Sequence, residues 1–132
     1  DIASQYGSEK WMDWQVGTLW PTLRPAFIGL TRVPVVEQNH ELILKSYQET
    51  NQLFEVLDQT LASQAFCSGE RFHLGDIVLS LCVHRWILIN NTFAKETGPR
   101  ANLQNIDRWL SRIKTETHFE EFAEKELNII NK

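Results

Sequence analysis

The segment from Leu74 to about Phe93 constrains the fold most, because apolar residues fall on nearly every face of the helix that it would form. These residues are Ile77, Val78, Leu79, Leu81, Cys82, Val83, Trp86, Ile87, Leu88 and Ile89. A helix that is apolar all round is surrounded by other helices or by lipid. His84 and Arg85 interrupt the run, which is much shorter than the roughly 20 apolar residues of a membrane span. The segment therefore predicts the central helix of a bundle and no membrane span.

Two amphipathic segments precede this central helix. The first runs from about Ser8 to Leu30, with Ser8 as its expected N-cap and with Pro21 and Pro25 expected to kink its second half. The second runs from about Val36 to Ala62 and repeats apolar residues every three or four positions, which is the spacing of a half-buried helix.

Two shorter helices are expected after the break at Thr97-Gly98-Pro99. One places Leu103, Ile106, Leu110 and Ile113 on a single stripe. The other begins at Thr117, where Thr117-His118-Phe119-Glu120 has the form of a capping box, and carries Phe119, Phe122, Ala123 and Leu127. Because no alternating strand pattern interrupts these segments, we predict an all-α bundle of five to six helices.

The composition fits a single folded domain over residues 1–132, since 42% of the residues are hydrophobic and 23% are charged. The formal charge of −4 opposes binding to a phosphate backbone, so no nucleic-acid partner is expected. Cys67 and Cys82 are the two cysteines, and such sparse use is typical of a reduced cytoplasmic protein. The N-terminus has no signal-peptide pattern and no initiator Met, which favours a processed or excised fragment.

The most informative motif surrounds the expected start of the central helix. With His73 as the N-cap, Asp76 occupies the third helical position, from which its carboxylate can accept a hydrogen bond from the His73 N–H. Phe72 and Ile77 then take the positions of a hydrophobic staple. Loss of the cap in Asp76→Ala would destabilise the fold by about 1–2 kcal/mol.

An alternative reading makes His73 and Asp76 an acid–base pair or part of a metal site. No third ligand accompanies them in the sequence, and capping already explains the carboxylate. We therefore predict no metal and no catalytic residue in this chain.

The same motif, Gly69…Phe72-His73-Leu74-Gly75-Asp76-Ile77, resembles the Gly…Phe-Thr-Leu-Ala-Asp-Ile stretch that begins the central helix of glutathione S-transferases. Two other stretches carry the resemblance to bacterial members of that family: Lys10-Trp11-Met12-Asp13-Trp14-Gln15 and Asn102-Leu103…Trp109-Leu110…Arg112. The sequence departs from the family at His73, where Ser or Thr is usual, and at Thr115-Glu116-Thr117, where many members have Arg-Pro.

This resemblance implies that the chain is the helical C-terminal domain of a glutathione S-transferase. The N-terminal thioredoxin-like domain of the family, which stabilises the glutathione thiolate, is not in this sequence, so the chain alone is expected to be inactive. It holds no cofactor of its own, and glutathione is the co-substrate of the full-length protein. The helical domain is expected to form the wall of the site for a hydrophobic electrophile and part of a homodimer contact.

The family map assigns substrate-binding roles to four residues of the first segment. Trp20 and Phe27 would form an apolar floor, and Arg24 and Arg32 would hold a glutathione carboxylate or an anionic substrate. Without the map, isolated arginines of this kind are ordinary solvated charges.

Other residues are expected to be structural. Trp11, Trp14 and Trp86 have the helical spacing of core anchors, and His84 and Arg85 are expected at the rim of the central helix with exposed heads. Two other functions remain open: a non-catalytic protein-interaction module and a ligand carrier.

Overall fold

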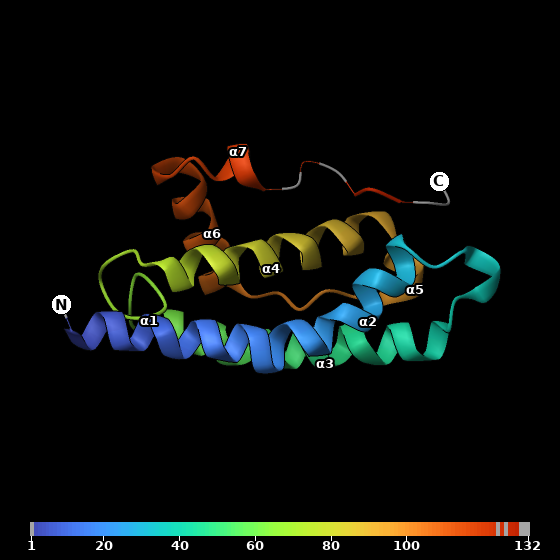
Figure 1. Ribbon diagram of the computed structural model, residues 1–132, viewed down its shortest axis with the longest axis horizontal. Coiled ribbons are helices and arrows are strands. Elements are labelled where there is room, and N and C mark those ends of the chain that lie inside the picture. Colours follow the sequence, from blue (N-terminus) through green and yellow to red (C-terminus); the bar gives the residue numbers. More distant parts are fainter. Residues whose placement is uncertain (1, 124, 126, 130–132) are drawn as a thin grey trace.

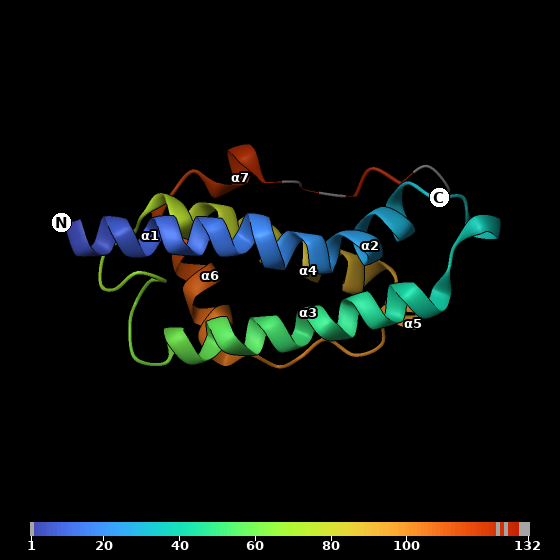
Figure 2. The ribbon, with the colours of Figure 1, turned by 60° about the horizontal axis from the view of Figure 1, so that its bottom comes forward.

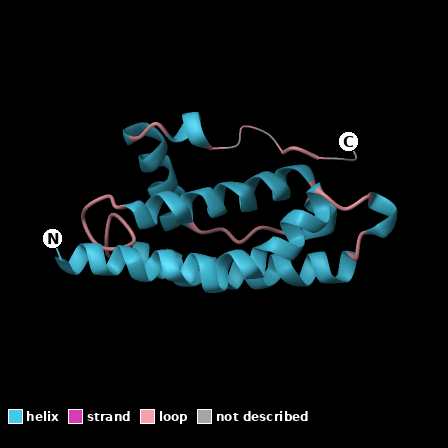
Figure 3. Cartoon of the chain, in the orientation of Figure 1, coloured by secondary structure: helices cyan, strands magenta, loops and turns pink. Residues whose placement is uncertain are grey.

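The structure, a computed structural model, describes residues 2–123, 125 and 127–129. The described residues form helices and no strand, apart from an isolated bridge between Phe66 and Gly69 (Figure 3). The elements are α1 (Ile2–Trp14), the π-helical turn η1 (Gln15–Leu19), α2 (Trp20–Thr31), the short 3₁₀ helix η2 (Val35–Glu37), α3 (His40–Leu61), α4 (Leu74–Thr92), α5 (Ala94–Thr97), α6 (Gln104–Glu116) and α7 (Phe119–Phe122). The prediction of an all-α bundle is confirmed.

Two long antiparallel rods form one side of the bundle. Elements α1, η1 and α2 follow one another in nearly one line, and α3 returns beside them (Figures 1 and 2). Helix α4 lies along the α1–α2 rod, and α6 crosses near the start of α4 (Figures 1 and 2). The described residues after α7 lie on the α4 side (Figures 1 and 2). In the described part of the chain, no helix is long and apolar enough to cross a membrane.

The core is built around α4, as its apolar composition predicts. Trp86, at the middle of this helix, is 1% exposed and stacks on Tyr47 of α3, with ring centroids 6.1 Å apart. Phe54 meets the same indole edge-on at 4.8 Å. The Tyr47 hydroxyl donates to the Trp86 carbonyl at 2.8 Å, so the buried phenol is satisfied. Trp86 is therefore a core anchor as expected, whereas Trp11 and Trp14 are only half-buried.

The interruption expected at the prolines takes the form of a π-helical turn just before Pro21. Pro25 lies inside α2, where it lacks a backbone donor. One turn around Pro25 is tied to α3 by the Ser46 hydroxyl, which accepts from the Ala26 N–H at 3.0 Å and donates to the Thr22 carbonyl at 2.6 Å. A side chain inserted in this way is one of the known causes of an irregular helix.

Three helix ends are capped by side chains of other helices. Ser8 lies inside α1, so its prediction as an N-cap of that helix is wrong; its hydroxyl accepts from the Gly75 N–H of α4 at 2.8 Å. Asp58 of α3 accepts from the Ile106 N–H of α6 at 2.9 Å, and Arg108 of α6 donates to the Leu61 carbonyl of α3 at 2.5 Å. These bonds satisfy terminal peptide groups and join helices at the same time.

The second helix begins later than its periodicity predicts. Helix α3 starts at His40 and not at Val36, because Asn39 is its N-cap and accepts from the Leu42 N–H through Oδ1 at 3.1 Å. Val35–Glu37 form the separate helix η2.

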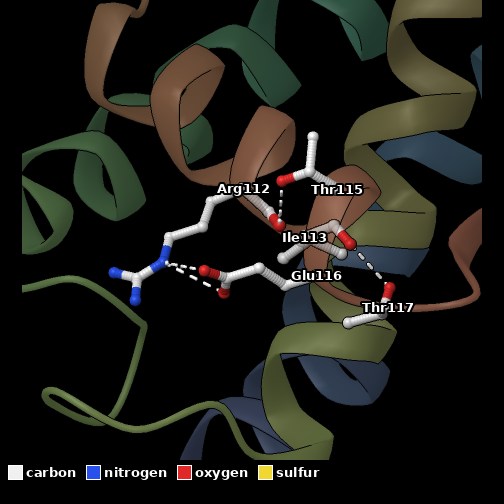
Figure 4. Close-up of polar contacts among 5 residues, drawn as sticks. All are labelled: Arg112, Ile113, Thr115, Glu116 and Thr117. Carbon is white, nitrogen blue, oxygen red and sulfur yellow. Dashed lines mark hydrogen bonds and ion pairs between the residues drawn. The ribbon is translucent and has the colours of Figure 1, made fainter.

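The predicted capping box at Thr117 is also wrong. The Thr117 hydroxyl donates to the Ile113 carbonyl at 2.6 Å and so belongs to the end of α6, beside the Arg112–Glu116 ion pair (Figure 4). Helix α7 begins at Phe119 and ends at Phe122, so Ala123 and Leu127 lie outside it, and the Phe122 side chain lies outside the described part of the structure.

Candidate functional site

The start of α4 holds a polar junction centred on the fully buried side chain of Asp76. Its Oδ2 accepts from the His73 N–H at 3.0 Å, which confirms the predicted cap. Its Oδ1 accepts from the Cys67 N–H and from the Trp109 indole N–H, both at 2.9 Å. Three donors from three segments therefore satisfy the carboxylate, and this bonding explains why a charged group is tolerated there.

The rest of the motif shapes the same junction. Gly75 lies where a Cβ atom would be 3.0 Å from both the Ser8 carbonyl oxygen and the Ser8 hydroxyl. Phe72 packs edge-on against Phe66, with centroids 5.7 Å apart. Both Phe72 and Ile77 are half-buried, and the direct contact expected between them stays a prediction.

The imidazole of His73 is the least satisfied part of the junction. His73 is half-buried, and its Nε2 is buried with no hydrogen-bond partner among the described residues. A buried polar atom without a partner costs about 1–3 kcal/mol.

Replacing His73 with threonine is expected to raise the free energy of unfolding by about 1 kcal/mol, because a hydroxyl is the better N-cap and the unpaired nitrogen is removed. Urea denaturation followed by circular dichroism measures the change. His118→Thr is the matched control, since His118 is the N-cap of the four-residue α7 and is exposed, and a change within about 0.5 kcal/mol is expected there. Destabilisation by His73→Thr would show that the imidazole makes a contact that a hydroxyl cannot replace.

A second cluster lies between α2 and α4 and contains two of the four predicted substrate-binding residues. The rings of Trp20 and Phe27 meet edge-to-face, with centroids 5.8 Å apart and planes at 60°. The guanidinium carbon of Arg85, on α4, lies 5.0 Å from each ring centroid. Phe27 is 5% exposed, while Trp20 is half-buried and keeps part of its surface accessible. We call these three residues the Trp20–Phe27–Arg85 cluster.

The prediction for Arg85, at the rim of the central helix with an exposed head, needs a correction for the head only. Arg85 is half-buried, and its guanidinium packs against the two rings of α2. The helical spacing of Leu81, Arg85 and Leu88 was the signal that Arg85 lies on an apolar face of the central helix.

The two predicted arginines occupy different surroundings. Arg24 is exposed on α2, between Trp20 and Phe27 in sequence. Arg32 is the C-cap of α2, and its guanidinium donates to the backbone carbonyl of Asn128 in the segment after α7. The structure therefore brings Trp20 and Phe27 together, whereas Arg32 holds the chain's own C-terminal segment.

Neither cysteine has the surroundings of a reactive thiol. Burial raises the pKa of the Cys67 thiol above its ordinary value of 9.0, and the nearby charge of Asp76 raises it further. Burial also raises the pKa of Cys82, which accepts a hydrogen bond from the Gln15 amide at 3.3 Å. Both thiols are therefore kept protonated and act as small apolar side chains. In the described part of the chain, no group of three or more His, Cys, Asp or Glu residues is placed to hold a metal ion.

The chain belongs to the glutathione S-transferase family: residues 12–116 match the family described as "Glutathione S-transferase, C-terminal domain". It is 35% identical over 126 residues to Glutathione S-transferase GstB of Escherichia coli (strain K12), a match that covers 85% of this chain and 57% of that protein. The chain thus spans little more than half the length of the curated relatives that it matches.

Solved structures agree with this assignment. The fold is similar to the theta class glutathione S-transferase of Xanthomonas axonopodis pv. citri with glutathione bound, with a TM-score of 0.82 and 26% identity over 96% of this chain and 58% of that chain. It is also similar in fold to glutathione transferase F7 of Populus trichocarpa, with a TM-score of 0.73 and 12% identity over 92% of this chain and 55% of that chain. The resemblance of the sequence to the C-terminal domain of this family is confirmed.

Proposed function

We propose that this chain is the helical half of a transferase in which a glutathione thiolate attacks a hydrophobic electrophile, and that the Trp20–Phe27–Arg85 cluster lies in the wall of the electrophile site. The observation that carries the proposal is the partly exposed Trp20 ring on buried Phe27. Aromatic surface of this kind is typical of ligand pockets. Exposed Arg24, on the same helix, would add an anion-binding group.

The chemistry of such a reaction requires a group that lowers the pKa of the glutathione thiol. The cysteines and Tyr47 of this chain are buried with raised pKa values, so they do not offer it. We propose that a thioredoxin-like domain, outside this sequence, supplies that group and most of the glutathione contacts. The relatives support this division, since this chain matches little more than half of their length.

Trp20→Leu in the full-length protein is expected to raise KM for an aromatic electrophile about tenfold, because the loss of one aromatic contact of about 1.4 kcal/mol weakens binding by that factor. The KM for glutathione should change less than twofold. Steady-state conjugation assays with each substrate varied in turn measure both constants. Val36→Ala is the control, since Val36 is 94% exposed on the distant η2. A change in the glutathione KM alone would contradict the proposed wall.

We also propose that the full-length protein is a cytoplasmic homodimer and that this domain supplies part of the subunit contact. The exposed side of α3 supports it, because Leu42 and Val56 are 48% and 51% exposed there. A groove of about 330 Å³ runs beside Leu42, between the proline-containing helix α2 and α3. Leu42 and Val56 lie 14 positions apart, so a partner would have to cover several turns of α3 to bury both side chains.

Native mass spectrometry of the protein from its source tests the whole assignment. A subunit longer than this chain by about 80 residues is expected, the size of a small domain, together with a mass of two subunits. A native subunit of this chain's length would overturn the transferase proposal and favour the protein-interaction module.

A further inference from the structure

Burial alone does not explain the position of the Arg85 side chain. It extends from the central helix and lies over both rings of the aromatic pair on α2, 5.0 Å from each centroid. Guanidinium groups are planar and stack on aromatic faces, which a lysine ammonium cannot reproduce. One side chain thus contacts the buried Phe27 and the half-exposed Trp20 at once.

This contact restricts the side chain of Trp20. Trp20 lies at the start of α2, directly after the π-helical turn and before Pro21, and is a partly buried residue at the edge of the core. A half-exposed indole without a cross-helix partner samples more than one rotamer. Contact with Phe27 on its own helix and with Arg85 on α4 restricts that freedom and holds the ring near 60° to the Phe27 plane.

We infer that Arg85 is a positioning residue that fixes the Trp20 indole, so that the wall of the site selects a flat aromatic group over an aliphatic chain. This inference rests on the proposed electrophile site. A fixed indole face binds a second ring by offset or edge-on contact without paying to order itself. An aliphatic chain is flexible and gains less from a fixed plane, so the gain from Arg85 is specific to aromatic ligands.

The test uses the full-length protein labelled with fluorinated tryptophan, in which single Trp→Phe changes assign the fluorine NMR signals of the five tryptophans of this chain. The probes are S-benzylglutathione and S-hexylglutathione, which share the peptide and differ in the flatness of the attached group. Arg85→Met keeps the apolar stem and removes the planar cation, and Arg85→Lys keeps the charge without the plane. Arg112→Met is the matched control, because Arg112 lies over Phe66 at 4.8 Å, away from this site.

In the unliganded full-length protein, Arg85→Met is expected to shift and broaden the Trp20 signal and to leave those of buried Trp86 and Trp109 in place. The preference for the benzyl over the hexyl probe should fall about threefold to tenfold. Arg85→Lys should recover little of that preference, and Arg112→Met should keep all of it.

The outcomes distinguish the positioning role of Arg85 from the existence of the electrophile site. If the Trp20 signal of the unaltered full-length protein responds to the benzyl probe but both Arg85 variants keep its position and the preference, the positioning role is overturned and the site stands. If neither probe moves the Trp20 signal of the unaltered full-length protein, the proposed site is overturned, and the selectivity assigned to Arg85 falls with it. If Arg85→Met disturbs all the tryptophan signals, Arg85→Lys decides, because full preference in that variant would overturn the role of the plane.

Discussion

Asp76→Ala is expected to lower the free energy of unfolding by about 3–5 kcal/mol, which is a large part of the stability of a domain of this size. The capping bond alone predicts about 1–2 kcal/mol. The structure raises this value because the fully buried carboxylate also accepts from the Cys67 N–H and the Trp109 indole N–H. Its removal leaves three donors unpaired, two of them in buried bonds, and each buried unpaired donor costs about 1–3 kcal/mol before relaxation.

The measurement is urea denaturation of the variant beside Asp58→Ala, a matched control. Asp58 also caps a helix from a distance, but it is half-buried, so a loss of about 1–2 kcal/mol is expected for it. Trp109→Phe and the double variant complete a cycle that isolates the indole bond, for which a coupling of about 1 kcal/mol or more is expected. Equal losses for Asp76→Ala and Asp58→Ala would mean that Asp76 acts only as a cap.

At the start of α4, one of these hydrogen bonds could be predicted from the sequence and another could not. The spacing of His73 and Asp76 was sufficient to predict the capping bond, because both groups lie within one turn of the same helix. The bond to Trp109 was not predictable, because it joins residues 33 positions apart and depends on how α6 crosses α4.

The same distinction explains the wrong predictions at Ser8 and Thr117. A hydroxyl near an apolar repeat has the composition of an N-cap, but composition does not say which helix it caps. Ser8 lies inside α1 and caps α4, and Thr117 bonds backwards to Ile113 (Figure 4). Local patterns gave the helices and their order, whereas the partners of short polar side chains were set by tertiary packing.

In the candidate site, too, some contacts follow from the sequence and others depend on tertiary packing. Trp20 and Phe27 share a helix face, so their contact follows from spacing once α2 is recognised. The Arg32 contact with the Asn128 carbonyl requires the chain to fold back from its C-terminal end, and no local pattern encodes that path. The head of Arg85 was assigned to solvent because it is a charge in an apolar helix, although aromatic faces are an equally good environment for a guanidinium.

The domain is expected to lose stability steeply above about pH 9, because three buried groups keep their protons in the folded state. Burial raises the pKa of Tyr47 above its ordinary 10.0, an effect that the charge of Arg100 only partly opposes. Burial likewise raises the pKa of Cys67, with the Asp76 charge adding to it, and the pKa of Cys82, both above 9.0. Unfolding exposes these groups to water and lets them ionise.

The sign follows from the direction of these shifts. A folded-state pKa above the unfolded value means that the contribution to stability is complete below the unfolded pKa and is lost as the pH rises toward the folded one. Each group should therefore remove about 1.4 kcal/mol per pH unit once the pH exceeds its unfolded pKa. Urea denaturation under reducing conditions, in steps from about pH 7 to pH 11, measures how steeply the free energy of unfolding falls with pH. Above about pH 9, Cys82→Ala should make this fall shallower by about 1.4 kcal/mol per pH unit, the contribution of one proton. Stability that stays constant to about pH 11 would show that these groups ionise equally easily in the folded chain.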